Sequence, residues 1–138
     1  MGGTYVLVLD VAKPIELDVG ALGRRAFRDG AYAYVGTAFG PGGFSRIDRH
    51  RELARGDRDV RHWHIDYLLG HDVTRVDAAI TFPDVDRECE LTDRLPGDRV
   101  DGFGASDCDC SAHLLAASGI EAVREAAIAE GGNELGSQ

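Results

Sequence analysis

TYVLVLD, residues 4–10, is the stretch that decides the fold of this 138-residue chain. Its β-branched and aromatic residues form an apolar run of strand length, which predicts a strand buried on both faces. AYAYVGT at 31–37 follows the turn signal Asp29-Gly30 and predicts a second strand in a hairpin or meander with the first. Between them, residues 15–19 alternate apolar and acidic side chains, as an edge strand does.

The rest of the chain adds helices and a further strand. Ser45 is a plausible N-cap for a helix that continues to Arg55. We expect a buried helical turn at 63–69, a strand at 75–82, and helices at 86–95 and 120–130, while 113–117 fits either a strand or a helix. This order predicts an α+β fold in which helices flank a small mixed β-sheet. We expect one domain over residues 1–130 and a flexible C-terminal tail at 131–138.

The charges are unusual for an intracellular protein. The net charge is −9, most of the acids are aspartates, and Lys13 is the only lysine among fifteen basic residues. Such a composition is typical of proteins adapted to high salt, where ions screen the repulsion between carboxylates. Residues 41–64 are the exception, with six arginines against four acids, which suits an element that faces phosphate or a solvated helix. No apolar run approaches membrane-spanning length and no signal sequence is evident, so we expect a cytoplasmic protein with no membrane contact.

The cysteines and histidines leave two interpretations open. Three cysteines in an intracellular chain make a disulfide framework unexpected. Cys108, Cys110 and His113 offer two sulfurs and an imidazole, and together with His62 and His64 they could bind Zn²⁺. The alternative is that the cysteines are small buried residues and that the histidines bind the backbone.

Several short motifs occur together in a recognisable order. They are Gly3-Thr4-Tyr5, Tyr34-Val35-Gly36, RIDRH at 46–50, HWHIDYL at 62–68, Glu88-Cys89, and GFGASDC at 102–108 followed by Cys110 and His113. This pattern resembles the GIY-YIG nuclease superfamily, in particular a branch whose members occur alone or fused to endonuclease-three-type repair glycosylases. The resemblance covers the chain from Gly3 to about Leu115. One departure is that residues 11–28 separate the two tyrosines, which in typical members lie on adjacent hairpin strands; we expect this segment to be an insertion between the first and the catalytic strand.

The resemblance implies a metal-dependent DNA endonuclease that hydrolyses phosphodiester bonds in DNA repair or maintenance, with DNA and repair proteins as partners. Tyr5 and Tyr34 match the catalytic tyrosines, and Arg46 matches the arginine that contacts the phosphate. Glu88 matches the glutamate that holds Mg²⁺ or Mn²⁺, with Glu90 as the alternative. A lone carboxylate suits Mg²⁺, because waters and substrate phosphate complete its shell.

Five further residues are candidate substrate contacts: Gly36, Arg49, His50, His62 and His64. Arg49 and His50 share a helical face with Arg46. Other interpretations remain open: the tyrosines could only pack in the sheet, and the arginine helix could be a solvated surface. As functions, the alternatives are a nucleic-acid-binding module without catalysis and a zinc-stabilised interaction protein.

Overall fold

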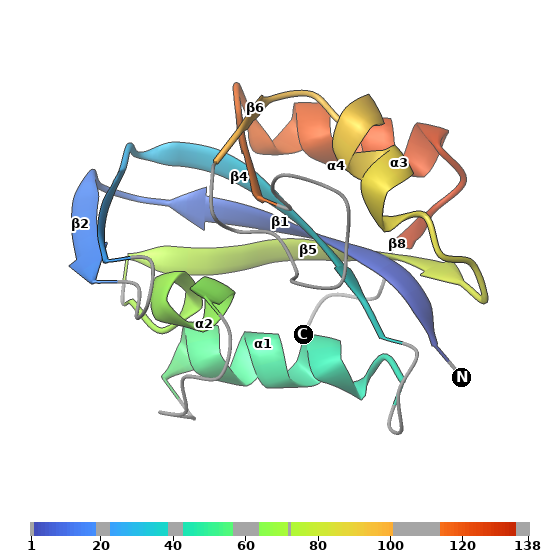
Figure 1. Ribbon diagram of the computed structural model, residues 1–138, viewed down its shortest axis with the longest axis horizontal. Coiled ribbons are helices and arrows are strands. Elements are labelled where there is room, and N and C mark those ends of the chain that lie inside the picture. The colour runs from blue at the N-terminus through green and yellow to red at the C-terminus, as the bar shows by residue number, and fades with distance from the viewer. Residues whose placement is uncertain are drawn as a thin grey trace.

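The computed structural model describes residues 2–18, 23–38, 43–56, 64–71, 73–100 and 114–134. A six-stranded sheet has the order β6-β7-β4-β1-β5-β8, and a separate two-stranded sheet pairs β2 with β3 (Figure 1). The strands are β1 (Gly3–Val11), β2 (Ile15–Asp18), β3 (Arg24–Phe27), β4 (Gly30–Thr37), β5 (Thr74–Pro83), β6 (Asp98–Arg99), β7 (Leu114–Ala117) and β8 (Asn133–Glu134). The helices are α1 (Ser45–Arg55), α2 (His64–Leu69), α3 (Glu88–Arg94) and α4 (Ile120–Ala129). The expected α+β class is confirmed.

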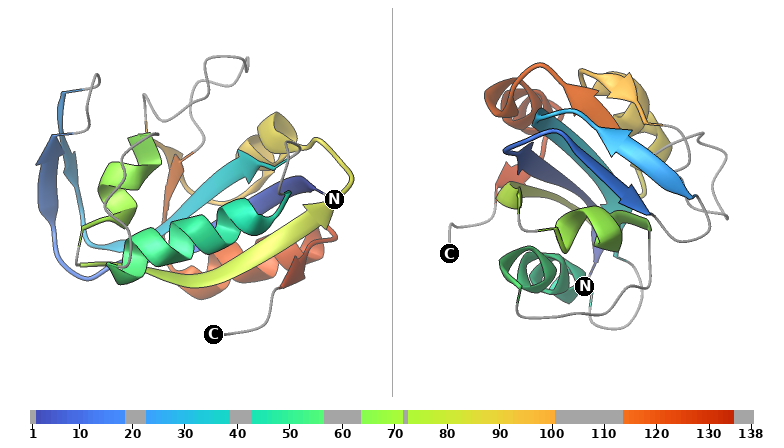
Figure 2. Two further views of the ribbon diagram at one scale, coloured as in Figure 1. Left: turned by 90° about the horizontal axis from the view of Figure 1, so that it is seen from below. Right: turned by 90° about the vertical axis from the view of Figure 1, so that its left-hand side faces the viewer.

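Strand β1 lies at the centre of the large sheet because its apolar run can be buried on both faces. Tyr5, Leu7 and Leu9 belong to the core cluster beneath α1 and α2, and Val6 and Val8 belong to the cluster beneath α3 and α4. Successive side chains of a strand point to opposite faces, so one strand supplies both cores. Figures 1 and 2 show the resulting three layers, with α1 and α2 on one face of the sheet and α3 and α4 on the other.

The insertion between the two tyrosines folds as the β2–β3 hairpin and leaves the large sheet undisturbed. Strands β1 and β4 pair directly and antiparallel, with Tyr5 opposite Gly36 and Leu7 opposite Tyr34. The two tyrosines therefore lie on adjacent strands despite the intervening residues 11–28. The edge strand expected at 15–19 exists as β2, but its partner is β3, which the sequence pattern did not predict.

The structure corrects two expectations about the sheet. Every strand pairing within the described residues is antiparallel, so the sheet is not mixed. The segment 131–138 is not simply a tail, because Asn133 and Glu134 pair with Thr81 and Ile80 of β5; residues 135–138 lie outside the described part of the chain. The ambiguous segment near 113–117 is strand β7. No helix in the described ranges is long and apolar enough to cross a membrane.

Candidate functional site

A cluster of two tyrosines and a histidine lies between the sheet and α1. The rings of Tyr5 and Tyr34 are 6.4 Å apart between centroids, and the His50 ring is 5.7 Å from Tyr5 and 6.0 Å from Tyr34. The strand register explains why the two tyrosine rings meet, because Tyr34 is opposite Leu7 and its side chain emerges on the face that carries Tyr5. His50 comes from the middle of α1, which packs on this face.

The cluster contains a buried hydrogen bond. Tyr5 Oη lies 2.8 Å from His50 Nε2, with Tyr5 1% exposed and His50 fully buried. Tyr34 is only partly buried. A phenol and an imidazole in such contact can share a proton, which is the chemistry that general acid–base catalysis requires. Of the two phenols, Tyr34 is the one that a molecule arriving from solvent can reach more directly.

Gly36 makes room for the cluster. A Cβ added at Gly36 would lie 2.6 Å from both Cζ and Oη of Tyr5, so any larger residue would displace the phenol. The expected substrate contact at Gly36 is untested, and the structure gives the residue a packing role instead. The sequence held a signal for this role, since a glycine inside a strand often marks the close approach of another group.

Arg49 is held by a buried ion pair. Its Nη1 donates to Asp66 Oδ1 at 3.1 Å and its Nη2 to Asp66 Oδ2 at 2.8 Å, with the side chains 15% and 0% exposed. This bidentate contact ties α1 to α2 next to His50. The structure thus gives Arg49 a structural partner, whereas the sequence suggested that Arg49 contacts the substrate. Asp66 was missed, although an acid inside the apolar run HIDYLL must find a partner when it is buried.

The structure gives less about three other candidates. Arg46 is in the first turn of α1 and His64 begins α2, but neither side chain is described; His62 lies outside the described residues. Ser45 is the first residue of α1 and not its N-cap, a position that Phe44 takes without a side-chain hydrogen bond. The first turn of α1 therefore has no side-chain cap.

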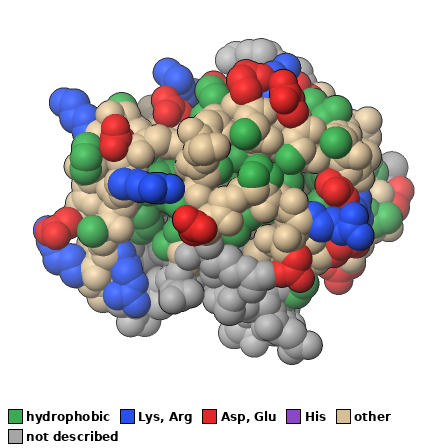
Figure 3. Space-filling view, turned by 90° about the horizontal axis from the view of Figure 1, so that it is seen from above, with side chains coloured by type: hydrophobic (Ala, Val, Ile, Leu, Met, Phe, Trp, Pro, Cys, Tyr) green, Lys and Arg blue, Asp and Glu red, His purple; other side chains and the backbone are tan. Residues whose placement is uncertain are grey.

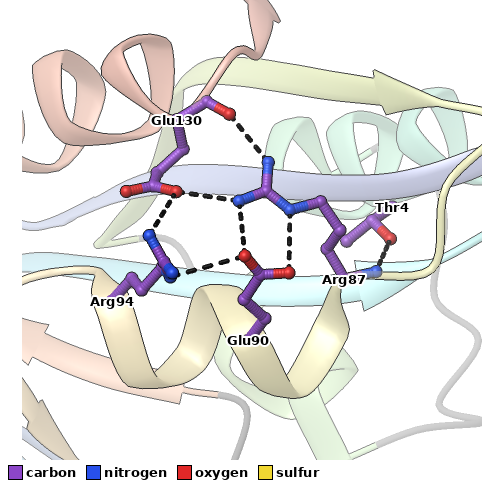
Figure 4. A network of polar contacts seen from close by, with 5 residues as sticks. All are labelled: Thr4, Arg87, Glu90, Arg94 and Glu130. Carbon is purple, nitrogen blue, oxygen red and sulfur yellow. Dashed lines mark hydrogen bonds and ion pairs between the residues drawn. The ribbon is translucent and has the colours of Figure 1, made fainter.

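Glu88 and Glu90 lie on α3, which packs against the opposite face of the sheet through Leu91 and Leu95. Glu90 is engaged by arginines: Arg87 donates from Nε and Nη2 at 3.1 and 3.0 Å, and Arg94 Nε lies 3.4 Å away (Figure 4). The hydrogen bonds from Arg87 lower the pKa of Glu90. Glu90 therefore serves a surface network, whereas Glu88 is partly buried in the first turn of α3.

The start of α3 is fixed by the strand that carries Tyr5. The buried Thr4 hydroxyl donates to the Val85 carbonyl at 2.7 Å and accepts from the Arg87 amide at 2.9 Å (Figure 4). Arg87 also bonds Glu130 at the end of α4 through the carboxylate at 2.8 Å and the carbonyl at 2.7 Å. These contacts set the position of the turn immediately before Glu88.

The pairing of β4 with β7 ends at Tyr34. Strand β7 pairs with β4 only from Ala31 to Tyr34, so among the described strands no neighbour covers β4 beyond Tyr34 on that side. Helix α3 packs against β4 from the other face. Tyr34 and helix α3 thus lie on opposite faces of the sheet, and the start of α3 is held by Thr4 of β1.

The remaining candidates are possible metal ligands and the cysteines. Within the described ranges no three His, Cys, Asp or Glu side chains gather to hold a metal ion. The proposed zinc ligands Cys108, Cys110 and His113 lie outside those ranges. Cys89 is disulfide-bonded, although three cysteines in an intracellular chain made a disulfide framework unexpected; its partner lies outside the described residues. The sequence context alone cannot reveal such a bond, because it depends on two segments meeting in space.

The fold and site define an α+β domain with a buried Tyr–His pair beside a half-buried tyrosine. The chain belongs to the family named Domain of unknown function DUF123, whose model matches residues 4–134. No curated protein and no solved structure matches the chain.

Proposed function

We propose that this protein is a metal-dependent DNA endonuclease of the GIY-YIG type. The observation that carries the proposal is the contact of Tyr5, Tyr34 and His50, which come from three separate elements. Tyr5 and Tyr34 are the residues that the sequence resemblance singled out. Their meeting on adjacent strands, despite the inserted hairpin, is the arrangement that the resemblance implies.

The distribution of charge supports an anionic substrate on the α1 side. The described residues from 2 to 71 hold eight Lys and Arg against seven Asp and Glu, whereas those from 73 to 134 hold five against eleven. The first group supplies α1, α2 and the hairpin, and the second supplies α3 and α4. Since like charges repel, a phosphate chain approaches more favourably from the side of α1 and the hairpin.

Each residue of the site has a role in phosphodiester hydrolysis. Tyr34, the more exposed phenol, activates the attacking water, and Tyr5 with His50 orients Tyr34 and relays a proton. Arg46, in the first turn of α1, pairs with the phosphate. Glu88 would hold one Mg²⁺ or Mn²⁺, because a single carboxylate fits an ion whose other ligands would be water and phosphate. The metal supplies electrostatic stabilisation of the charge that develops on the phosphate.

Such an activity places the protein in the cytoplasm, in contact with DNA and with repair proteins. Branched or damaged DNA is the substrate class that repair requires.

The test is incubation with branched, damaged and single-stranded DNAs in molar KCl, with Mg²⁺ or Mn²⁺. Tyr34→Phe, Arg46→Ala and Glu88→Ala should each lower the cleavage rate about a hundredfold or more, as the loss of one key electrostatic or proton-transfer group typically does. Tyr32→Phe and Glu90→Ala are the matched controls, because Tyr32 donates to the Arg28 carbonyl and Glu90 serves the α3 network. Both controls should cut normally.

The outcomes separate the alternatives. If the wild type cuts no DNA but binds it in a way that depends on Arg46, the protein is a binding module. If Glu90→Ala abolishes cleavage and Glu88→Ala does not, the metal-holding residue is Glu90. Normal cutting by both Tyr34→Phe and Tyr5→Phe would remove the phenol chemistry from the mechanism.

A further inference from the structure

The β2–β3 hairpin has no part in the site described above, yet the fold anchors it firmly. Ile15, Leu17 and Phe27 contact the core beneath α1 and α2. The Phe27 ring packs edge-on against Tyr32, with centroids 6.3 Å apart, and the Tyr32 hydroxyl donates to the Arg28 carbonyl at 2.7 Å. An isolated two-stranded hairpin is marginally stable, so these contacts fix its root and its direction.

Of the exposed cations of the hairpin region, Arg24 pairs with Glu16 at 3.3 Å, and three others lack acidic partners among the described residues. Lys13, Arg25 and Arg28 are exposed, and none forms an ion pair with an acid in the described part of the chain. Other exposed arginines are paired, such as Arg94 with Glu90 and Arg75 with Asp10. Figure 3 shows Lys and Arg side chains, with Asp and Glu among them, at the end of the molecule where the hairpin lies. Exposed acids, Asp18 and Asp29, also lie in this region, but in a protein of net charge −9 three cations that pair with no described acid are available to an external anion.

The hairpin lies on the same side of the sheet as the basic helix α1. Strand β2 packs against α2, which in turn packs against α1. Arg25 is directly opposite Leu17, so it shares the hairpin face that is turned toward the core and α2. Figure 2 shows the hairpin standing at one end of the molecule beside α2.

The distance from the site to the hairpin suits a nucleic-acid duplex. Tyr5 is near the start of β1 and the hairpin follows its end at Val11, which at about 3.3 Å per residue is roughly 20 Å along the strand. With a rise of about 3.4 Å per base pair, this corresponds to about six base pairs of duplex. A phosphate chain held at Tyr34 and Arg46 can therefore reach the hairpin cations along the surface of α1 and α2.

We infer that the β2–β3 hairpin is a second, sequence-independent contact for the phosphate backbone of duplex DNA, made by Lys13, Arg25 and Arg28. This inference rests on the proposed function and adds a substrate requirement: duplex must extend about six base pairs from the cut on the hairpin side. Arginine and lysine contacts of this kind position a duplex without reading its bases. A shorter duplex keeps the cutting site occupied but loses the hairpin contact.

The test compares two double variants with the same change in net charge. Arg25→Gln/Arg28→Gln removes hairpin cations, and Arg94→Gln/Arg124→Gln removes acid-paired arginines from α3 and α4. Binding of a duplex of about 30 base pairs is measured over a fourfold range of KCl, with circular dichroism to check folding. The salt slope is the slope of the logarithm of the binding constant against the logarithm of the salt concentration, and each lost phosphate contact reduces its magnitude by about 0.9. Over the fourfold range of KCl, the fall in affinity of the hairpin variant should therefore be about tenfold smaller than that of the wild type. The control should keep the wild-type slope.

The same variants are then assayed for cleavage. On a duplex that ends fewer than about six base pairs from the cut on the hairpin side, the hairpin variant and the wild type should cut alike. A wild-type salt slope in the hairpin variant, with cleavage intact, would overturn this inference and leave the proposed function standing. Equal changes in both double variants would also overturn it, since bulk charge would then explain the effect. If the wild type neither binds nor cuts duplex DNA, the proposed function fails, and this inference with it.

Discussion

Replacing Gly36 by alanine tests the packing on which the candidate site depends. The new Cβ would lie 2.6 Å from Cζ and Oη of Tyr5, whereas carbon contacts need about 3.5 Å or more. Gly36 is not among the glycines with positive φ, so the backbone itself accepts alanine. Because β-pairing with Tyr5 fixes the backbone at Gly36, the Tyr5 ring has to move by about 1 Å.

The expected cost follows from this displacement. Overpacking a core typically costs about 1–3 kcal/mol. A movement of about 1 Å also breaks the 2.8 Å contact between Tyr5 and His50, which adds roughly 1 kcal/mol. We expect Gly36→Ala to lower the free energy of unfolding by about 2–4 kcal/mol. If the proposed function holds, the cleavage rate should fall by about a hundredfold, since the site is displaced by a similar distance.

Urea denaturation followed by circular dichroism measures the effect on stability. Gly119→Ala is the control, because no atom lies within 4 Å of a Cβ added there and its φ is −171°. That variant should stay within about 1 kcal/mol of the wild type. In a Tyr5→Ala background, which removes the ring, Gly36→Ala should cost far less than in the wild type. Equal stabilities of Gly36→Ala and Gly119→Ala would refute the close packing of Tyr5 on Gly36.

Four further predictions concern stability and the cysteines. Asp66→Ala leaves the Arg49 guanidinium mostly buried without its carboxylate, so we expect a loss of about 3–5 kcal/mol in urea denaturation; a loss below about 1 kcal/mol, as for exposed pairs, would contradict this. Thiol titration of the denatured protein should find one free thiol if Cys89 is bridged, and three free thiols together with bound zinc would support the zinc site instead. The melting temperature should rise from low to molar KCl because salt screens the acidic surface, and an unchanged value would refute the halophilic interpretation. The folded-state pKa of Glu90 is below its ordinary value of 4.5, so the ionised carboxylate stabilises the folded state above pH 4.5. This stabilisation is lost as the pH falls through the folded-state pKa. Glu90→Gln should therefore flatten the acid limb of a stability–pH curve.

Local patterns in the sequence determined most of the secondary structure. The apolar run at 4–10, the run at 31–37 and the strand expected at 75–82 are β1, β4 and β5. The helix expected after an N-cap at Ser45 is α1, whose N-cap is Phe44, one residue earlier. These predictions succeeded because strand and helix periodicity depends on neighbouring residues alone. Strand β3 was missed because RRAF carries no apolar alternation, and its pairing with β2 comes from the chain that folds back on it.

Only the tertiary structure decided which candidate residues meet. The sequence singled out Tyr5, Tyr34 and His50, but the register of β1 against β4 and the packing of α1 brought them together. The same packing formed the ion pair between Arg49 and Asp66, which are seventeen residues apart along the chain. On the opposite face, Glu90 of α3 pairs with Arg87. A sequence specifies the residues available for a site, whereas contacts between distant segments depend on how the cores on both faces of the sheet pack, and no local pattern encodes that packing.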